Sequence, residues 1–401
     1  MSTTTPRPAL LLLAYLAFVS LGLPDGLLGV GWPSIRAEFG VPTESVGLLL
    51  TAGTVGYLTS SVAAGFTLAR VGVGWLLAGS TALASLALSG YAGAPMLPLM
   101  VGAALLLGLG SGAVDSGLNA YAASAFGPRH MNWLHAFFGL GVAIGPLIMT
   151  TVIGAGLSWR WGYGIVASAQ VLLALAFVFT VRAWDDRRSA VPAAHGASGP
   201  PARPARVRIG ATLGLPAVWT GTVAFAVYVG VEVGAGLWAF LLLTEGRGLS
   251  EAVAGICVSI YWGSLFVGRV VQGLVAERLG SGQVLRGSLI GMAVGSALVA
   301  VPGPAGLAVV GLAIIGFAAA PVFPLLTLTT AERVGAVHAD RAIGLQIGAA
   351  GLGGALLPAG IGVLLSRVTV EALGPSLLVL SLILLAVYLV STRRRVPDAV
   401  A

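Results

Sequence analysis

Residues 9–33 read ALLLLAYLAFVSLGLPDGLLGVGWP, an almost unbroken apolar run that contains one acidic residue, Asp25. A run of about 20 apolar residues lets a helix cross the hydrocarbon core of a bilayer. A charge at mid-bilayer costs about 2.5 to 3.5 kcal/mol on insertion scales, so an acid retained there indicates a function. The run therefore predicts a transmembrane helix that carries a functional carboxylate.

The whole chain has the composition of a membrane protein. Its 401 residues are 57% hydrophobic and only 9% charged, whereas soluble domains are usually about one quarter charged. The apolar runs are too long to be strands of a membrane barrel. These features predict an all-α membrane protein in a lipid bilayer, and the 59 glycines suit close packing between its helices.

Twelve apolar runs are long enough to cross the membrane, and they fall into two sets of six. Their approximate bounds are 9–33, 45–69, 75–93, 97–125, 133–157, 160–182, 215–243, 251–276, 283–302, 305–332, 340–366 and 370–392. We expect an N-terminal six-helix bundle over 1–182 and a C-terminal one over 215–401. Residues 183–214, rich in Pro, Ala and Arg, are expected to be a cytoplasmic linker.

The arginines predict the orientation, because the chain has no lysine. On one side of the expected membrane lie Arg7, Arg70, Arg129, Arg182, Arg278, Arg286, Arg333, Arg341, Arg393 and those of the linker. The opposite side has only Arg36, Arg160, Arg247 and Arg367. The positive-inside rule then places the linker and both termini in the cytoplasm. Because the arginines lie at loop positions on one side, the basic pI is not a sign of nucleic-acid binding.

Three acids lie inside the apolar runs: Asp25, Asp115 and Glu232. Asp25 is sixteen residues past the start of its run, and Glu232 is seventeen past the start of the seventh. Matching depths in the first run of each half predict a quasi-symmetric central site between the halves. We expect all three acids to bind a coupling proton. The alternative for Asp25 and Glu232 is a structural role, in which they bond to backbone that proline or nearby glycines have freed. The alternative for Asp115 is an interhelical hydrogen-bond pair with Asn119.

Polar and aromatic residues in the same runs are expected to bind a small-molecule substrate. Asn119 lies four residues after Asp115, on the same helix face, and aromatic rings can stack on a sugar ring. The candidates are Asn119, Tyr228, Trp238, Tyr261, Trp262 and Gln346. The alternative for the aromatic residues is contact with lipid or with other helices, and we expect one or two of the four to line a cavity.

Two further residues have competing interpretations. Arg269, two turns from the cytoplasmic end of the eighth run, could gate the protein or pair with an acid, or its side chain could reach to the interface. His135, one turn inside the fifth run, is expected to be a packed interfacial histidine, with a proton relay as the alternative.

Several short motifs follow one another in a recognisable order. They are Gly26-x-x-Gly29-x-x-Trp32-Pro33, Asp115-x-x-x-Asn119, Asn132-Trp-Leu-His135-Ala-Phe-Phe-Gly139, Tyr228-Val-Gly-Val-Glu232, Gly268-Arg269 and Phe323-Pro324. In this order they resemble the major facilitator superfamily, and more narrowly its fucose/galactose/glucose:proton symporter branch and bacterial relatives. The resemblance implies two pseudo-symmetric six-helix bundles, proton-coupled transport of a sugar-like solute by alternating access, and a monomer in a bacterial inner membrane.

The superfamily's cytoplasmic loop motif, Gly-x-x-x-Asp-Arg-x-Gly-Arg-Lys, occurs twice in degraded form. One copy runs from Gly65 through Arg70 to Gly72, with Ala69 in the place of the acid; the other runs from Gly273 through Glu277 and Arg278 to Gly280. The resemblance implies that Arg70, Glu277 and Arg278 act as gating residues, and that the copy without its acid is the weaker latch.

One motif favours a different direction of transport. Residues 141–146, GVAIGP, are similar to the glycine–proline motif of drug:proton antiporters, so an exporter of drugs or natural products is the alternative. A non-transporting membrane sensor is a third possibility. We expect no enzyme, because no phosphate-binding loop, nucleophile elbow or zinc signature is present. With four histidines and only Cys257, we expect neither a metal site nor a cofactor.

Overall fold

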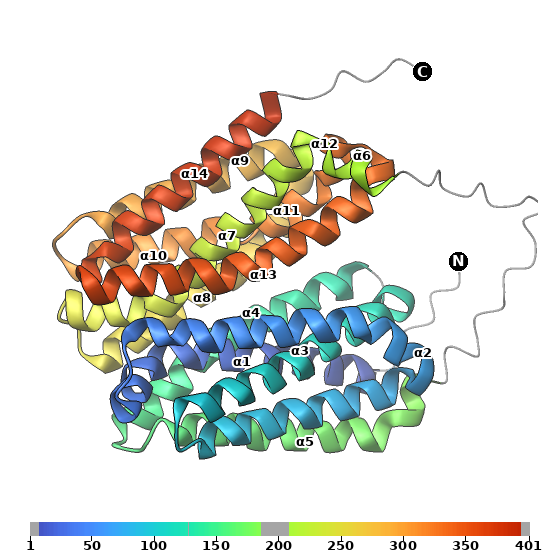
Figure 1. Ribbon diagram of the computed structural model, residues 1–401, viewed down its shortest axis with the longest axis horizontal. Helices are drawn as coiled ribbons and strands as arrows, with labels where there is room; N and C mark the ends of the chain where they lie inside the picture. Colours follow the sequence, from blue (N-terminus) through green and yellow to red (C-terminus); the bar gives the residue numbers. More distant parts are fainter. Residues whose placement is uncertain (1–7, 127, 186–207, 394–401) are drawn as a thin grey trace, which may run out of the picture. The chain divides into compact units, whose positions relative to one another are not determined.

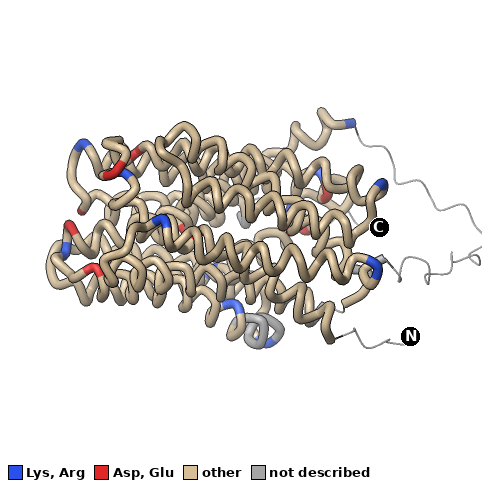
Figure 2. The backbone as a smooth tube through the Cα atoms, turned by 90° about the horizontal axis from the view of Figure 1, so that it is seen from below, with Lys and Arg blue, Asp and Glu red and all other residues tan. Residues whose placement is uncertain are grey.

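The computed structural model describes residues 8–126, 128–185 and 208–393. Within them the chain is helical, and eleven helices are long and apolar enough to cross a membrane (Figure 1). Most of the predicted linker lies outside the described residues. Charged positions gather toward the helix ends and leave long uncharged stretches between them (Figure 2).

The helices form two compact units. The first unit contains α1 (Pro8–Phe39), α2 (Val46–Gly93), α3 (Leu97–Ala125), α4 (Pro128–Gly154), α5 (Arg160–Asp185) and the first turns of α8, Glu251–Ser259. The second contains α6 (Ile209–Leu213), α7 (Pro216–Leu241), the rest of α8 (Glu251–Leu279), α9 (Ser281–Ala300), α10 (Ala305–Ala319), α11 (Val322–Leu328), α12 (Thr330–Val334), α13 (Ala336–Arg367) and α14 (Leu373–Arg393). The predicted division into halves, 1–182 and 215–401, remains a proposal, because the linker at their boundary lies mostly outside the described residues.

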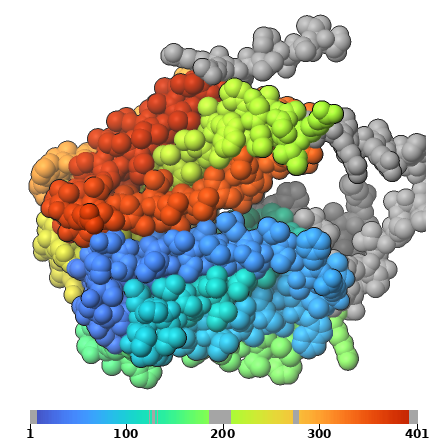
Figure 3. Space-filling model, viewed as in Figure 1, coloured from blue at the N-terminus to red at the C-terminus, as the bar shows by residue number. Residues whose placement is uncertain are grey.

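Helix α2 explains why eleven helices correspond to twelve predicted spans. It covers two of the predicted runs, 45–69 and 75–93, and the chain turns between them at Gly72. Gly72 has φ 79° and ψ 171°, a conformation that side chains with a Cβ disfavour. Both arms then pack on α3, and on the face shown in Figure 3 the side chains of α2 and α3 lie against each other without a gap.

Glycines set the closest helix contact in the first unit, where α1 packs along α4. A Cβ on Gly26 would overlap the Val142 carbonyl, and one on Gly145 would overlap the backbone of Gly26. Gly141 is equally close to the backbone of α1 at Val19. Small residues allow this approach between membrane helices. The glycine–proline motif therefore forms a packing surface within this unit.

The second unit repeats the arrangement with α7 and α13, which are the first and fifth predicted spans of their half. Here a Cβ on Gly353 would overlap the backbone of Ala226, and one on Gly230 would overlap Leu357. The two halves therefore pair equivalent helices through the same device, in agreement with their predicted internal similarity.

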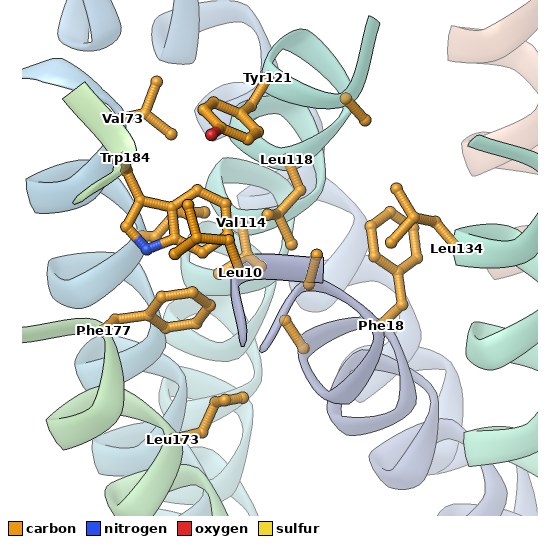
Figure 4. Close-up of a cluster of buried hydrophobic side chains, with 14 of the residues drawn as sticks. Leu10, Phe18, Val73, Val114, Leu118, Tyr121, Leu134, Leu173, Phe177 and Trp184 are labelled. Atoms are coloured by element: carbon orange, nitrogen blue, oxygen red, sulfur yellow. The ribbon is translucent and has the colours of Figure 1, made fainter. Parts of the chain in front are cut away.

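One end of the first unit is closed by an aromatic and aliphatic cluster (Figure 4). Trp184 from α5 packs against Tyr121 and Phe177, with ring centroids 4.9 and 5.6 Å away. Its indole nitrogen donates to the Thr180 hydroxyl at 3.1 Å. Leu10 from α1 also joins the cluster, which holds the ends of five helices together.

An arginine clasp lies at the other end of the first unit. Arg160, the first residue of α5, pairs with Glu38 on α1 at 2.7 Å and donates to the carbonyl of Ala92 on α2 at 3.0 Å. Its guanidinium lies 4.5 Å from the Trp159 ring, whose indole nitrogen also donates to Glu38, at 2.6 Å. The clasp joins the end of the first span, the end of the third and the start of the sixth.

The second unit has the same clasp with its charges exchanged. Arg247 follows α7, and it pairs with Glu371, just before α14, at 2.9 Å. It also donates to the carbonyls of Val299, Val301 and Gly303 at the end of α9, at 3.1, 2.9 and 2.8 Å. The same three spans of the half are joined, but here the first span supplies the arginine and the sixth the acid. Sequence analysis identified neither clasp.

We predict that the two clasps differ in their contribution to stability. The Arg247 side chain is only 2% exposed, against 25% for Arg160. Arg247→Ala leaves the half-buried Glu371 carboxylate and the Val299 carbonyl without their donor, so it should lower the free energy of unfolding by about 2 to 3 kcal/mol. Arg160→Ala should cost about 1 kcal/mol or less, as exposed pairs do. Denaturant unfolding in mixed micelles measures both, and equal losses would contradict the assignment.

Candidate functional site

Asp25 lies on α1 directly after a proline that interrupts the helix's hydrogen bonding. Pro24 has no N–H to donate to the Ser20 carbonyl four residues earlier. Gln170 on α5, only 2% exposed, donates to that carbonyl instead, at 3.3 Å. The proline is therefore accommodated without Asp25, and the structural role considered for this acid is taken by Gln170.

The Asp25 side chain differs from its surroundings. It is exposed, although every other residue from Ser20 to Trp32 is buried. It makes no hydrogen bond or ion pair with any of the described residues. A carboxylate inside an apolar span that lacks a partner is costly in its charged form, so this acid gains most from taking up a proton.

Asp115 on α3 is instead held by two neutral donors. The Tyr57 hydroxyl on α2 donates to its Oδ2 at 2.6 Å, and the Asn119 amide donates to its Oδ1 at 3.0 Å. The hydrogen-bonded pair of Asp115 and Asn119, which was the alternative to a functional role, is thus observed within α3, whereas Tyr57 was missed. Two donors stabilise the carboxylate form of an acid.

The contact between α2 and α3 is what brings Tyr57 to Asp115. Gly112, one turn before Asp115, lies so close to α2 that a Cβ there would overlap the Tyr57 carbonyl and the Ser60 hydroxyl. An apolar run flanking a lone tyrosine gives no sequence signal for this register. The Oδ1 of Asn119 is buried and has no hydrogen-bond partner among the described residues, so its capacity to accept a hydrogen bond is unused in this conformation.

Tyr57 also lies within electrostatic range of Asp25, as do Tyr91 and Tyr163. Asp25 and Asp115, which are 90 residues apart, are therefore neighbours of the same phenol in the first unit. The structure places these two predicted acids in one region and gives them different chemical environments.

Glu232 on α7 is the third acid, and it has a charged partner. Its Oε1 lies 3.8 Å from Nη2 of Arg269 on α8, with the two side chains 14% and 22% exposed. The possibility that Arg269 pairs with an acid is thus realised. The distance is longer than that of a charge-assisted hydrogen bond, which is about 2.7 to 2.9 Å. Asp25 and Glu232 occupy similar positions in the sequences of their predicted spans, but of the two only Glu232 has a charged partner among the described residues.

Three of the predicted substrate-binding aromatics are instead part of the core of the second unit. Tyr228, Trp238 and Tyr261 are at most 1% exposed. They donate to the backbone carbonyls of Ala319, Pro358 and Glu232, at 3.0, 2.9 and 2.7 Å respectively. The Tyr228 bond reaches the end of α10, where the span breaks before Pro321. In this conformation they are not placed to contact a solute.

Trp262 and Gln346 are also buried. The Trp262 ring lies against Gly236, and Gln346 accepts a hydrogen bond from Thr330 at 2.9 Å while its amide lies beside Gly221. Among the predicted substrate-binding residues, Asn119 is therefore the one that the described contacts favour. The roles proposed for the others remain predictions.

The two copies of the loop motif share a turn. Arg70 and Arg278 are exposed, and each is followed two residues later by a glycine with φ 79°. Sequence analysis missed a third copy, in which Arg333 precedes Gly335, with φ 83°; the recurring Arg-Val/Leu-Gly would have revealed it. The Glu277 side chain lies outside the described residues, so the predicted gating roles stay predictions.

His135 is exposed on α4, with its ring edge-on to Phe18 at a centroid distance of 5.4 Å. This favours the interfacial interpretation, and the relay remains untested. An apolar groove of about 620 Å³ on the second unit, lined by residues of α8, α9 and α10 such as Val284, Val310 and Ile314, carries no acidic side chain. It is therefore separate from the acids described above.

A family model described as Major Facilitator Superfamily matches residues 14–358 and again 238–400. The chain belongs to the major facilitator superfamily and is a multi-pass membrane transporter of small molecules. The predicted fold class and superfamily are thereby confirmed. The narrower symporter branch stays a prediction.

Similar proteins include the 3-(3-hydroxy-phenyl)propionate transporter of Escherichia coli strain K12. It is 28% identical over 293 residues, which cover 70% of this chain and 69% of that protein. Among solved structures, the nucleoside transporter NupG has a TM-score of 0.68 at 15% identity, covering 96% of this chain and 99% of that one. A point mutant of NupG has a TM-score of 0.71 at 13% identity, covering 96% and 100%. The structural matches show the shared fold.

We predict that Tyr57 and Asp115 are energetically coupled. A hydrogen bond to a charged group contributes about 1.5 to 3 kcal/mol, so Tyr57→Phe should lower the free energy of unfolding by about that amount. In an Asp115→Asn background the same change should cost much less. Denaturant unfolding of the four proteins gives the coupling free energy, and additive losses would show that the bond contributes nothing.

Proposed function

We propose that this protein is a proton-coupled secondary transporter that moves a small polar solute by alternating access. The observation that carries the proposal is the state of Asp25, an exposed carboxylate without a described partner inside an otherwise buried apolar stretch. A proton neutralises such an acid and lowers the cost of moving it through a low-dielectric region. Proton binding and release at Asp25 would thus be linked to conformational change.

The other two acids take different parts. Asp115 accepts hydrogen bonds from Tyr57 and Asn119, so we assign it to solute binding as a hydrogen-bond acceptor, beside the unpartnered Asn119 oxygen. Glu232 is compensated by Arg269. Of the three acids predicted to bind a proton, we therefore propose Asp25 as the principal proton site.

Two classes of solute are supported. The resemblance to the sugar symporter branch favours a sugar-like compound, whose hydroxyls suit Asp115 and Asn119. The similar Escherichia coli protein is named as a transporter of an aromatic carboxylic acid, which favours an organic acid. Arginine placement supports both termini in the cytoplasm of a bacterial inner membrane, and the resemblance supports a monomer.

Export of drugs or natural products is the second candidate. The glycine–proline motif at residues 141–146 gives less support to export than the sequence alone indicated. Its glycines pack against α1, and an equivalent packing of glycines occurs in the second unit. Growth protection against a panel of compounds, compared with uptake assays, separates the two directions. A membrane sensor would show no solute flux in either assay.

We predict that Asp25→Asn abolishes accumulation of solute driven by a pH gradient in proteoliposomes, because a permanently neutral side chain cannot load a proton. Exchange of solute without a gradient should continue. Asp340→Asn is the matched control, since Asp340 is exposed in the second turn of α13 and should be replaceable without effect. If the Asp25 variant still accumulates solute against its gradient, the proton role fails.

A further inference from the structure

The pair of Glu232 and Arg269 differs from two other ion pairs among the described residues, Arg160–Glu38 and Arg247–Glu371. Its shortest contact is 3.8 Å, whereas the Arg160–Glu38 and Arg247–Glu371 contacts are 2.7 and 2.9 Å. Those pairs lie at helix ends. The Glu232 pair lies inside apolar spans, where a close contact would give the greatest benefit, and yet it is the longest of the three.

The surrounding side chains leave the pair in this loose state. The Tyr228 hydroxyl lies within hydrogen-bond reach of both the Ala319 carbonyl and the Glu232 carboxylate, so its one hydrogen is shared between them. The Tyr261 hydroxyl donates to the backbone oxygen of Glu232 rather than to its carboxylate. Both phenols therefore fix the helices, and Arg269 provides the charge that compensates Glu232.

Among the described helices packed on α7, α12 carries Glu332 and Arg333. Helices α10 and α11 contain no titratable residue. Those of α13 lie toward its ends, at His338, Asp340, Arg341 and Arg367, and Tyr388 of α14 bonds to the Gly282 carbonyl. Glu232 is the carboxylate that the described contacts place beside Arg269.

We propose that Arg269 is the binding site for a carboxylate of the solute, and that Glu232 occupies this site while no solute is bound. The inference rests on the proposed function and specifies its substrate class. When a proton from solution binds to Glu232, its pairing with the guanidinium is lost. A solute carboxylate then restores the charge balance at Arg269, whose planar fork fits a carboxylate with two hydrogen bonds. The charge of the pair is unchanged, so the exchange avoids an uncompensated charge in the membrane.

The test uses the purified full-length protein and measures binding at acidic and neutral pH. The probes are a set of monocarboxylates from acetate to 3-phenylpropionate, the neutral 3-phenylpropionamide, and fucose. We expect 3-phenylpropionate to bind more tightly at acidic pH and its amide to bind at least roughly 10- to 100-fold more weakly, as expected when charge-assisted hydrogen bonds are lost.

Two variants test the roles of the charges. In Glu232→Gln, carboxylate binding should be equally tight at both pH values, because the competing charge is absent. In the double variant Arg269→Gln, Glu232→Gln, which leaves no unpaired charge and so should fold, carboxylate binding should fall roughly 10- to 100-fold. Melting temperatures without probe confirm that each variant is folded.

The proposal is overturned if no carboxylate in the set binds, whether or not fucose does. It is also overturned if the double variant binds carboxylate as tightly as the natural protein. It is also overturned if Glu232→Gln retains the pH dependence. Asp25→Asn separates this proposal from the transport mechanism, since that variant should bind carboxylate normally even though it no longer accumulates solute.

Discussion

The hydrocarbon of the bilayer cannot satisfy a polar group, and this constraint governs the interior of both units. Where helix hydrogen bonding is interrupted, a side chain from another helix supplies the missing donor. Gln170 donates to the Ser20 carbonyl below Pro24, and Tyr228 donates to the Ala319 carbonyl where α10 ends. The need to satisfy polar groups also explains why large aromatic residues are buried, because their hydroxyl and indole groups donate hydrogen bonds to backbone carbonyls of other helices.

The three acids differ in the partners that compensate their charge. Asp115 has two donors and Glu232 has an arginine, whereas Asp25 has neither among the described residues. Charge in a low-dielectric medium must be compensated, and this requirement distinguishes the proposed roles of the three acids. Asp25 binds a proton, Asp115 accepts hydrogen bonds, and Glu232 competes for the Arg269 cation. The glycine contacts between α1 and α4 and between α7 and α13 provide the scaffold on which these environments are built.

The spans and the acids could be predicted because apolar runs and isolated charges are recognisable in the sequence itself. The partners could not, since helices that are apolar all round give no signal for which face is buried. Tyr57 and the aromatics at Tyr228 and Tyr261 illustrate this failure. The Arg160 and Arg247 clasps did leave a signal in the sequence, because few arginines lie on the predicted outer side of the membrane. The positive-inside rule uses only the number of arginines on each side, so it says nothing about the residues with which Arg160 and Arg247 pair. At Gly72 the chain leaves the helical conformation, between two of the spans that the apolar pattern had predicted.

The most direct test of the account is the reactivity of the three acids with dicyclohexylcarbodiimide, which modifies protonated carboxyl groups in apolar surroundings. Mass spectrometry of the digested protein would locate and quantify the modification across a range of pH. The account predicts that Asp25 is modified most, that its modification increases as the pH falls, and that Asp115 reacts little. Modification of Asp115 in preference to Asp25, or an unreactive Asp25 at every pH, would contradict it.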